Sequence, residues 1–253
     1  MQSAALTDTG RVRSHNEDTI FCTTNPIGPL PNLFIVADGM GGHNAGEVAS
    51  RESVEYSCDY LRGLEPAALS PEEALKLLVE AVDQANMGVY VQSLTGQEMR
   101  GMGTTFSACT ILGTTLVIAH IGDSRIYSIS PGSPGSITQL TTDHTYVAEM
   151  IKAGYLTPEN AKTHPNRSQL TRVLGYEPEI QVDGALHELN TAETVLLCSD
   201  GLTDMLTNDE IMNIICTQGQ PQARAQALID AANNNGGIDN ISVIIIDMAG
   251  EPN

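Results

Sequence analysis

Short apolar runs predict the strands of this chain. The runs are rich in β-branched residues, and several of them stop at an aspartate or a glycine, as strands bounded by turns do. They occupy residues 33–37, 105–112, 116–121, 125–129, 194–198 and 241–247. We therefore expect a fold that is rich in strands.

Longer segments between these runs have the spacing of helices. They occupy residues 45–62, 71–94, 208–217 and 220–233. The second segment has a clear start, because Ser70 suits an N-cap and Pro71 suits the first helical position, with acidic residues in the first turn. Its apolar side chains form one stripe, so this helix should pack on a flat surface.

Strands come in runs and helices come in pairs along the chain. This grouping predicts an α+β fold with antiparallel sheets and helices on their outer faces. The Pro- and Gly-rich stretches are short and suit turns, so we expect one domain over residues 1–253. Residues 144–175 are polar, with little strand character and at most two short helical stretches, which predicts a mobile or lid-like insertion.

The chain carries 31 acidic and 12 basic residues, a net charge of -19. Such a charge repels nucleic acid and anionic membranes, so neither is an expected partner. The five cysteines are scattered and form no CxxC pair, as in a reduced, cytoplasmic protein. The sequence has no signal-peptide pattern and no run of about 18 apolar residues, so we expect a soluble, free-standing protein in the cytoplasm.

Acidic residues stand where the apolar runs begin or stop. They are Glu17, Asp18, Asp38, Asp123, Asp200 and Asp239. Carboxylates gathered at the rim of a sheet repel one another unless cations lie between them, and oxygen ligands suit magnesium or manganese. A single Asp-Gly after a strand is ordinarily a turn, but the repetition along the chain favours a metal centre. We interpret Asp8 and Asp143 as turn or capping residues.

Two further residues suit phosphate chemistry. Arg13 precedes Asp18 by five positions, and a guanidinium beside metal-binding acids can grip phosphate oxygens, whereas Arg11 is interpreted as a surface residue. His43, in the glycine-rich loop after Asp38, is a candidate general acid for a leaving alkoxide. That loop lacks the GxxxxGK(S/T) pattern of nucleotide-binding loops. The chain has no GxSxG, HExxH or CxxxxxR motif, which disfavours covalent cysteine catalysis.

Seven motifs follow one another in a fixed order. They are residues 10–18 (GRVRSHNED), 36–43 (VADGMGGH), 102–105 (MGTT), 120–127 (HIGDSRIY), 140–145 (LTTDHT), 198–204 (CSDGLTD) and 237–242 (GIDNIS). With these motifs in this order, the chain resembles the type 2C, or PPM, family of serine/threonine protein phosphatases in its compact bacterial form. The resemblance implies a four-layer α-β-β-α sandwich, in which two antiparallel sheets are flanked by helices.

The resemblance also implies how two core ions are bound. Asp38 would bridge the two ions, and the carbonyl of Gly39 would bind one of them. Asp200 and Asp239 would bind the first ion. The expected cofactor is Mn²⁺ or Mg²⁺.

Outer ligands and a third, weaker ion are implied in the same way. Glu17 and Asp18 would act on the second ion, partly through water, and Asp123 would be a ligand of the third. Residues 144–175 would be the family's flap, beside the active site. This segment carries Glu159 and Asn160, and the sequence leaves open whether either contributes to the third ion.

The implied reaction is the hydrolysis of phosphoserine and phosphothreonine monoesters without a covalent intermediate. A hydroxide that bridges the two metal ions would attack phosphorus directly. Arg13 would hold the phosphate, and His43 matches the family's proposed general acid. Phosphorylated proteins are the expected substrates, and a monomer is expected. The sequence leaves open which phosphoprotein is used and whether phosphotyrosine is accepted.

Two other functions share some of these features. A non-catalytic regulator would keep the fold and only bind a phosphoprotein, but such relatives typically lose ligand residues, and here the acidic residues and Arg13 are all present. A metal-dependent nuclease would use the same ions, but the charge of -19 and the lack of a basic stripe disfavour it. A metal-dependent protein phosphatase is the favoured hypothesis.

Overall fold

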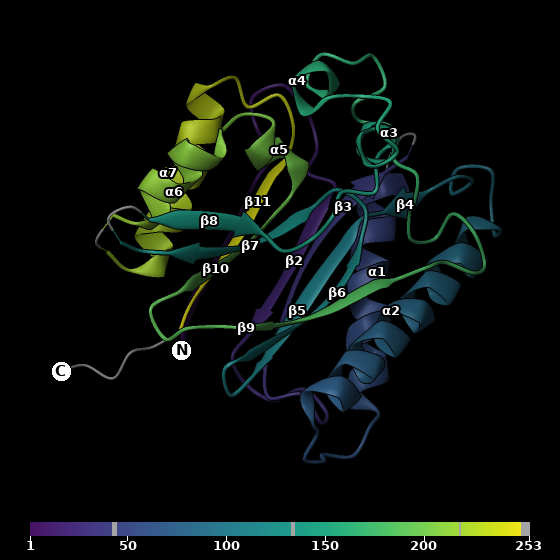
Figure 1. Cartoon of the computed structure of the whole chain (residues 1–253). Helices are drawn as coiled ribbons and strands as arrows, with labels where there is room; N and C mark the ends of the chain where they lie inside the picture. Colours follow the sequence, from purple (N-terminus) through teal and green to yellow (C-terminus); the bar gives the residue numbers. More distant parts are fainter. Residues whose placement is uncertain (42–44, 133–134, 218, 249–253) are drawn as a thin grey trace.

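Two antiparallel sheets face each other at the centre of the molecule (Figure 1). The computed structural model describes residues 1–41, 45–132, 135–217 and 219–248. Sheet A has the strand order β1 (Gln2–Asp8), β11 (Ile241–Asp247), β10 (Thr194–Cys198), β7 (Arg125–Ser130) and β8 (Ser136–Gln139). Sheet B has the order β2 (Asp18–Thr23), β3 (Leu33–Met40), β5 (Phe106–Leu112), β6 (Thr115–Ile121) and β9 (Asp183–Glu188), and β4 (Gly103–Thr104) pairs with β3.

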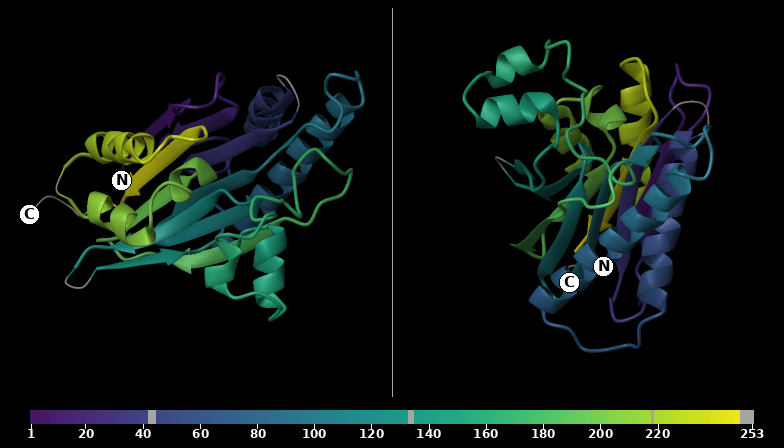
Figure 2. Two further views of the ribbon diagram at one scale, coloured as in Figure 1. Left: turned by 90° about the horizontal axis from the view of Figure 1, so that it is seen from above. Right: turned by 90° about the vertical axis from the view of Figure 1, so that its right-hand side faces the viewer.

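Helices cover the outer face of each sheet (Figure 1, Figure 2). On sheet B these are α1 (Ala45–Arg62) and α2 (Pro71–Ser93). On sheet A they are α6 (Asn208–Ile215) and α7 (Pro221–Asn234), with the short α5 (Asp200–Thr203) beside β11. The predicted α+β class and the four-layer sandwich are confirmed.

Alternation along the strands divides the apolar side chains among three cores. In β3, Leu33, Ile35 and Ala37 pack toward α1 and α2, whereas Phe34 and Val36 lie between the two sheets. A third core lies between sheet A and its helices. Because both faces of the central strands are buried, their sequences are continuous apolar runs instead of alternating ones.

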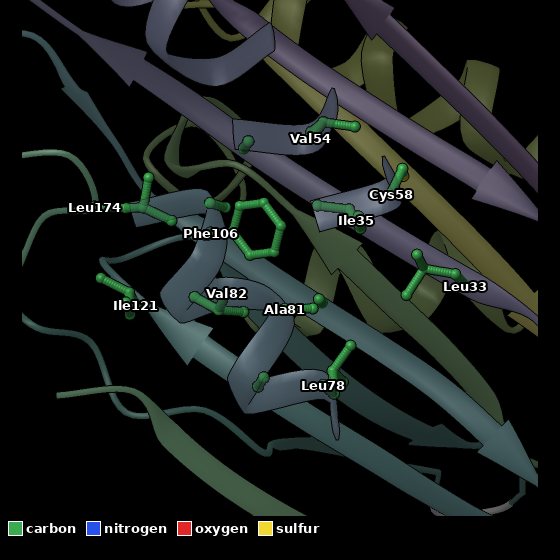
Figure 3. Close-up of a cluster of buried hydrophobic side chains, with 14 of the residues drawn as sticks. Leu33, Ile35, Val54, Cys58, Leu78, Ala81, Val82, Phe106, Ile121 and Leu174 are labelled. Atoms are coloured by element: carbon green, nitrogen blue, oxygen red, sulfur yellow. The ribbon is translucent and has the colours of Figure 1, made fainter. Parts of the chain in front are cut away.

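Helix α2 shows how a local signal fixes an element. The Ser70 hydroxyl accepts from the backbone N–H of Glu73, and the Glu73 carboxylate accepts from the backbone N–H of Ser70, which is a capping box. The apolar stripe of α2 then packs on sheet B. Figure 3 shows Leu78 and Val82 in one cluster with Phe106 of β5.

All six predicted strands and all four predicted helices are present, with small shifts at their ends. Among the described residues, no helix combines the length and the apolar character that crossing a bilayer requires.

The segment predicted as a flap holds two short helices, as expected. They are α3 (Tyr146–Lys152) and α4 (Pro158–Ala161), and they lie at the end of the sandwich where β3 meets β4 (Figure 1). One backbone bridge at the base of the segment pairs Thr145 with Leu170, and a second ties Leu174 to β4. Its action as a flap stays a prediction.

Candidate metal centre

The carboxylates of Asp18 and Asp38 face the same space between the sheets. The two residues are direct partners in the antiparallel β2–β3 pair. Phe34 and Val36 of β3 point into the space between the sheets. Side chains alternate along a strand, so Asp38 points to the same side as Phe34 and Val36. Asp18 lies directly opposite Asp38 in the strand pair and points to that side too.

Two serines, one directly after β10 and one in β11, hold one oxygen of Asp18. Ser199 Oγ donates to Asp18 Oδ2 at 2.8 Å, and Ser242 Oγ donates to it at 2.6 Å. Oδ1 of Asp18 is buried and has no hydrogen-bond partner among the described residues. Burial raises the pKa of Asp18 to about 6, although the two hydroxyl donors act in the opposite direction. Asp18 is therefore fixed through one oxygen, and the other stays free for a ligand.

Sheet A brings two more carboxylates to the same end. Because β10 and β11 are antiparallel neighbours, Asp200, two residues after β10, lies near Asp239, two residues before β11. Oδ1 of Asp200 is also buried without a partner in the described part of the chain. Burial raises the pKa of this carboxyl well above its usual range, and the charges of Asp123, Asp204 and Asp239 add to the effect.

Asp38 lies among these acids. Burial raises its pKa well above the usual range, and the charges of Asp18, Asp200 and Asp123 raise it further. Its backbone is fixed by Thr105, whose hydroxyl accepts from the Asp38 N–H at 2.9 Å. Like charges this close cannot all be ionised without compensation, so the centre must take up either protons or cations.

Gly39 occupies a place that admits no side chain. A Cβ on this residue would lie 2.1 Å from the carbonyl oxygen of Gly46 and 2.6 Å from that of Glu17. The Gly39 N–H donates to the Glu17 carbonyl at 3.1 Å, which brings Glu17 beside the turn after Asp38. Glu17 Oε1 is buried without a partner in the described ranges, and burial raises the pKa of this carboxyl.

Asp123 follows β6, and its charge acts on both Asp38 and Asp200. Burial raises its pKa to about 7, and the charge of Asp143 contributes to the rise. Asp143 is not the turn or capping residue that we expected from the sequence. Arg125 binds it with two donors, Nε to Oδ1 at 2.9 Å and a terminal nitrogen to Oδ2 at 2.6 Å. This bidentate pair compensates the charge of Asp143, so Asp143 competes poorly for a cation.

Asp204 is a member of the cluster that the sequence analysis missed. It follows Asp200 by four residues across α5, a spacing that places two side chains on one face of a helix. Its charge contributes to the raised pKa of both Asp123 and Asp200. The signal was present in the motif CSDGLTD, which has an aspartate at each of these positions.

Arg13 reaches the cluster from an exposed loop. Its terminal nitrogen donates to Oδ2 of Asp239 at 2.7 Å, and half of its side chain remains exposed. This hydrogen bond raises the pKa of Arg13, so the guanidinium stays charged. Arg11, in the same loop, is exposed, as predicted.

The described structure does not test the roles of three residues singled out in the sequence. His43 lies outside the described residues. Glu159 and Asn160 are exposed on α4 in the predicted flap.

The residues that are present fit hard divalent cations. Glu17, Asp18 and Asp200 each have a buried carboxylate oxygen without a partner among the described residues, which is costly unless a cation or water binds it. Oxygen donors of this kind suit Mg²⁺ or Mn²⁺. Within the described ranges, no three acidic, histidine or cysteine side chains converge as ligands of one ion. The site therefore suits ions that keep part of their water shell, as Mg²⁺ commonly does.

Comparison with known protein families decides the classification. A family model described as protein phosphatase 2C matches residues 10–231. The chain belongs to the protein phosphatase 2C family. Two related proteins of this family align over nearly the whole chain. Serine/threonine phosphatase stp of Listeria monocytogenes is 36% identical over 247 residues, which cover 98% of this chain and 96% of the relative. Protein phosphatase PhpP of Streptococcus pneumoniae is 36% identical over 248 residues, which cover 98% of each chain.

Solved structures show the same sandwich. The serine/threonine phosphatase PstP/Ppp of Mycobacterium tuberculosis matches with a TM-score of 0.86 and 34% identity over 98% of this chain and 99% of that one. Stp1 of Staphylococcus aureus matches with a TM-score of 0.89 and 32% identity over 98% and 95% of the two chains. A structure of the PstP catalytic domain in complex with two manganese ions matches with a TM-score of 0.83 and 33% identity over 97% of each chain.

As a protein phosphatase 2C, this chain is a metal-dependent phosphoprotein phosphatase, and the activity predicted from its motifs is confirmed. The acidic cluster lies at one end of the two sheets. The role of each residue in the cluster belongs to the proposal below.

Proposed function

We propose that the acidic cluster holds Mn²⁺ or Mg²⁺ and that this chain uses these ions to remove phosphate from phosphoserine and phosphothreonine in proteins. The observation that supports this most is the set of buried carboxylate oxygens without a partner in the described structure, on Glu17, Asp18 and Asp200. Buried carboxylate oxygens of this kind can bind cations, and the charged Arg13 beside them can bind a phosphate group.

Two core ions would be held by residues from both sheets. Asp38 would serve both ions, and the carbonyl of Gly39 would serve one of them. Asp200 and Asp239 would serve the first ion, with part of this contact made through water, because no three such side chains converge on one ion in the described structure. The charges of Asp200 and Asp239 both raise the pKa of Asp38, so these two carboxylates lie near Asp38. This proximity supports the assignment.

The remaining acids serve outer positions. Glu17 and Asp18 act on the second ion, partly through water. Asp123 would serve a third, weaker ion, and Asp204 would be a further ligand for that ion, because Asp123, Asp200 and Asp204 line one cavity.

The protein residues hold the substrate and move its proton. When bound, the divalent ions supply activation of water and neutralisation of charge on the phosphoryl oxygens. Arg13 grips phosphoryl oxygens with donors that its contact to Asp239 leaves free, because a guanidinium carries five N–H donors. Ser199 and Ser242 keep Asp18 in place. His43 protonates the departing serine or threonine oxygen.

The partners and the location follow from the charge and the fold. Phosphorylated proteins are the substrates, and the reaction serves signalling. With a net charge of -19, the chain repels nucleic acid and anionic membranes. We propose that it works as a monomer in the cytoplasm.

Phosphate release from a phosphothreonine peptide tests this function. The protein is treated with chelator, then assayed without metal and with added Mn²⁺ or Mg²⁺. We expect turnover only with metal. The variant Asp38→Asn should be at least about 100-fold slower, since changes even to the partners of metal ligands cost about 10- to 100-fold.

The matched control is Asp59→Asn. Asp59 is an exposed aspartate on α1 that pairs with Arg62, so this variant should keep wild-type turnover. Full activity after exhaustive chelation, or near-normal turnover by Asp38→Asn, contradicts the proposal. Binding of the phosphopeptide without any turnover supports a non-catalytic regulator instead.

A further inference from the structure

The side chain of Asn240 makes three hydrogen bonds to one loop. Asn240 is buried, with 5% of its surface exposed. Its Nδ2 donates to the carbonyl of Thr9 at 2.9 Å and to the carbonyl of His15 at 2.9 Å. Its Oδ1 accepts from the backbone N–H of Glu17 at 2.8 Å. Both donor hydrogens and one acceptor position of the amide are therefore used on the main chain of this loop.

The loop in question carries Arg13. It connects β1 of sheet A to β2 of sheet B, so it crosses from one sheet to the other. The carbonyls of Thr9 and His15 lie on either side of Arg13 in the sequence, and residues 11–15 are exposed. An exposed segment of this kind has few packing contacts of its own, so its shape depends on hydrogen bonds at its two ends.

Asn240 is also next to the residue that Arg13 contacts. Asp239 accepts from Arg13 at 2.7 Å, and the Asn240 N–H donates to Asp239 Oδ1 at 2.8 Å. Asp239 thus fixes the guanidinium of Arg13. The next residue, Asn240, fixes the main chain of the loop that carries Arg13. One further bond, from the Arg11 N–H to the Gly237 carbonyl at 2.7 Å, joins the loop to the same segment.

We propose that Asn240 is a positioning residue for phosphate binding. It fixes the loop that carries Arg13 and Glu17 in place relative to Asp239. Asn240 itself touches neither substrate nor ion and acts through Arg13. The inference rests on the proposed role of Arg13 in binding phosphate. If the guanidinium of Arg13 is displaced slightly, it keeps its charge, but its N–H donors no longer point at the phosphate oxygens.

A cycle of four proteins tests the proposal. They are the wild type, Asn240→Ala, Arg13→Ala and the double variant, each saturated with Mn²⁺. The inhibition constant of inorganic phosphate is measured against a phosphothreonine peptide. We expect each single variant to raise this constant by about tenfold, as the loss of one charge-assisted hydrogen bond does. The double variant should stay within about twofold of Arg13→Ala, because residues that act through one contact are not additive.

The outcomes separate this inference from the proposed function. If Arg13→Ala leaves the inhibition constant unchanged, the phosphate-binding role of Arg13 is wrong. If Arg13→Ala raises it but Asn240→Ala raises it by the same factor with and without Arg13, then Asn240 does not act through Arg13 and the inference is overturned.

Asn32→Ala is the matched control. Asn32 is a buried asparagine at the opposite end of β3, and its amide bonds the main chain of Ile111 at 2.9 and 2.8 Å. Its loss should lower the melting temperature and leave phosphate inhibition unchanged. An equal effect of Asn32→Ala on phosphate inhibition would mean that Asn240 matters only for folding.

Hydrogen exchange in the wild-type protein tests the inference even if Asn240→Ala does not fold. The Glu17 N–H, held by the buried Asn240 amide, should exchange much more slowly than the amide of the exposed Ser14 nearby. Equally fast exchange at both amides would show that Asn240 does not fix the loop, and would overturn the inference.

Discussion

Asp18 lies directly opposite Asp38 in the antiparallel pair of β2 and β3, and both carboxylates enter the space between the two sheets. Like charges at directly opposite positions destabilise a strand pair. Here Ser199 and Ser242 also fix one oxygen of Asp18 and leave the other unpartnered in the described structure. The fold therefore holds a repulsive pair in place at the end where we propose that the phosphatase reaction occurs.

The metal-free protein should lose stability as the pH rises. Burial raises the pKa of Asp18 to about 6 and that of Asp123 to about 7, whereas an aspartate in an unfolded chain has a value of about 3.9. Between these values the folded protein binds more protons than the unfolded one, so the contribution of these groups to the free energy of unfolding is present at low pH. It is lost as the pH rises through the folded-state values.

Scanning calorimetry at about pH 5 and about pH 7.5, with and without Mn²⁺, measures this effect. Metal binding needs ionised carboxylates, so Mn²⁺ should raise the melting temperature more at the higher pH. At a concentration of about 100 times the dissociation constant the gain is about 2.7 kcal/mol, or several degrees for a chain of this size. An equal or larger gain at the lower pH would contradict the assignment of a cation to this cluster.

Replacing Ser242 by alanine should weaken metal binding. The variant removes one of the two hydroxyls that orient Asp18, and the loss of such a partner typically costs about 10- to 100-fold in metal affinity. Titration calorimetry with Mn²⁺ measures the change. Ser57→Ala is the matched control, because Ser57 is a buried serine that donates only within α1, to the Val54 carbonyl. Wild-type affinity in Ser242→Ala would show that Asp18 does not need this donor.

Arg13→Ala should lower kcat/KM for a phosphothreonine peptide by about 10- to 100-fold, the range expected when hydrogen bonds to a charged group are lost. Arg13→Lys should recover only part of the loss, because lysine keeps the charge but lacks the planar set of donors. Arg11→Ala, which removes an exposed arginine of the same loop, should behave as the wild type. Equal effects of the Arg11 and Arg13 variants would indicate a general effect of positive charge.

Ser70→Ala should affect stability and not catalysis. It removes the capping box of α2, and the loss of an N-cap serine costs about 1 kcal/mol. For a chain of this length that corresponds to a fall of about 2–4 °C in the melting temperature. Thermal unfolding followed by circular dichroism measures the fall, and phosphate release should remain at the wild-type rate. A lowered turnover would show that α2 influences the metal centre.

The apolar pattern predicted the central strands and missed the edges. Five strands lie outside that prediction. β1, β2, β8 and β9 are the outermost strands of the two sheets, and β4 is a two-residue strand that pairs with β3. β9, for example, alternates between partly buried and exposed residues and contains Gly184, so it lacks a continuous apolar run. Only strands that are covered on both faces need such a run, which explains why the signal was confined to the centre of each sheet.

The metal centre was predicted from residues that end strands, and this physical signal has limits. Asp8 is a turn residue as expected, because its carboxylate accepts from the Gly10 N–H at 2.8 Å. The prediction for Asp143 was wrong, because its partner Arg125 lies 18 positions away in the sequence on another element. Ser199 and Ser242 were missed for the same reason: each contacts Asp18 across more than 180 residues. Contacts between distant segments become visible only in the folded chain.

Anomalous diffraction from crystals of the Mn²⁺-loaded protein tests the central claim most directly, because it locates each manganese ion independently of activity. We expect two strong peaks that share Asp38, one of them next to the Gly39 carbonyl, and a weaker third peak beside Asp123. Strong peaks elsewhere on the acidic surface, with none at Asp38, would contradict the assignment of the acidic cluster as the metal centre.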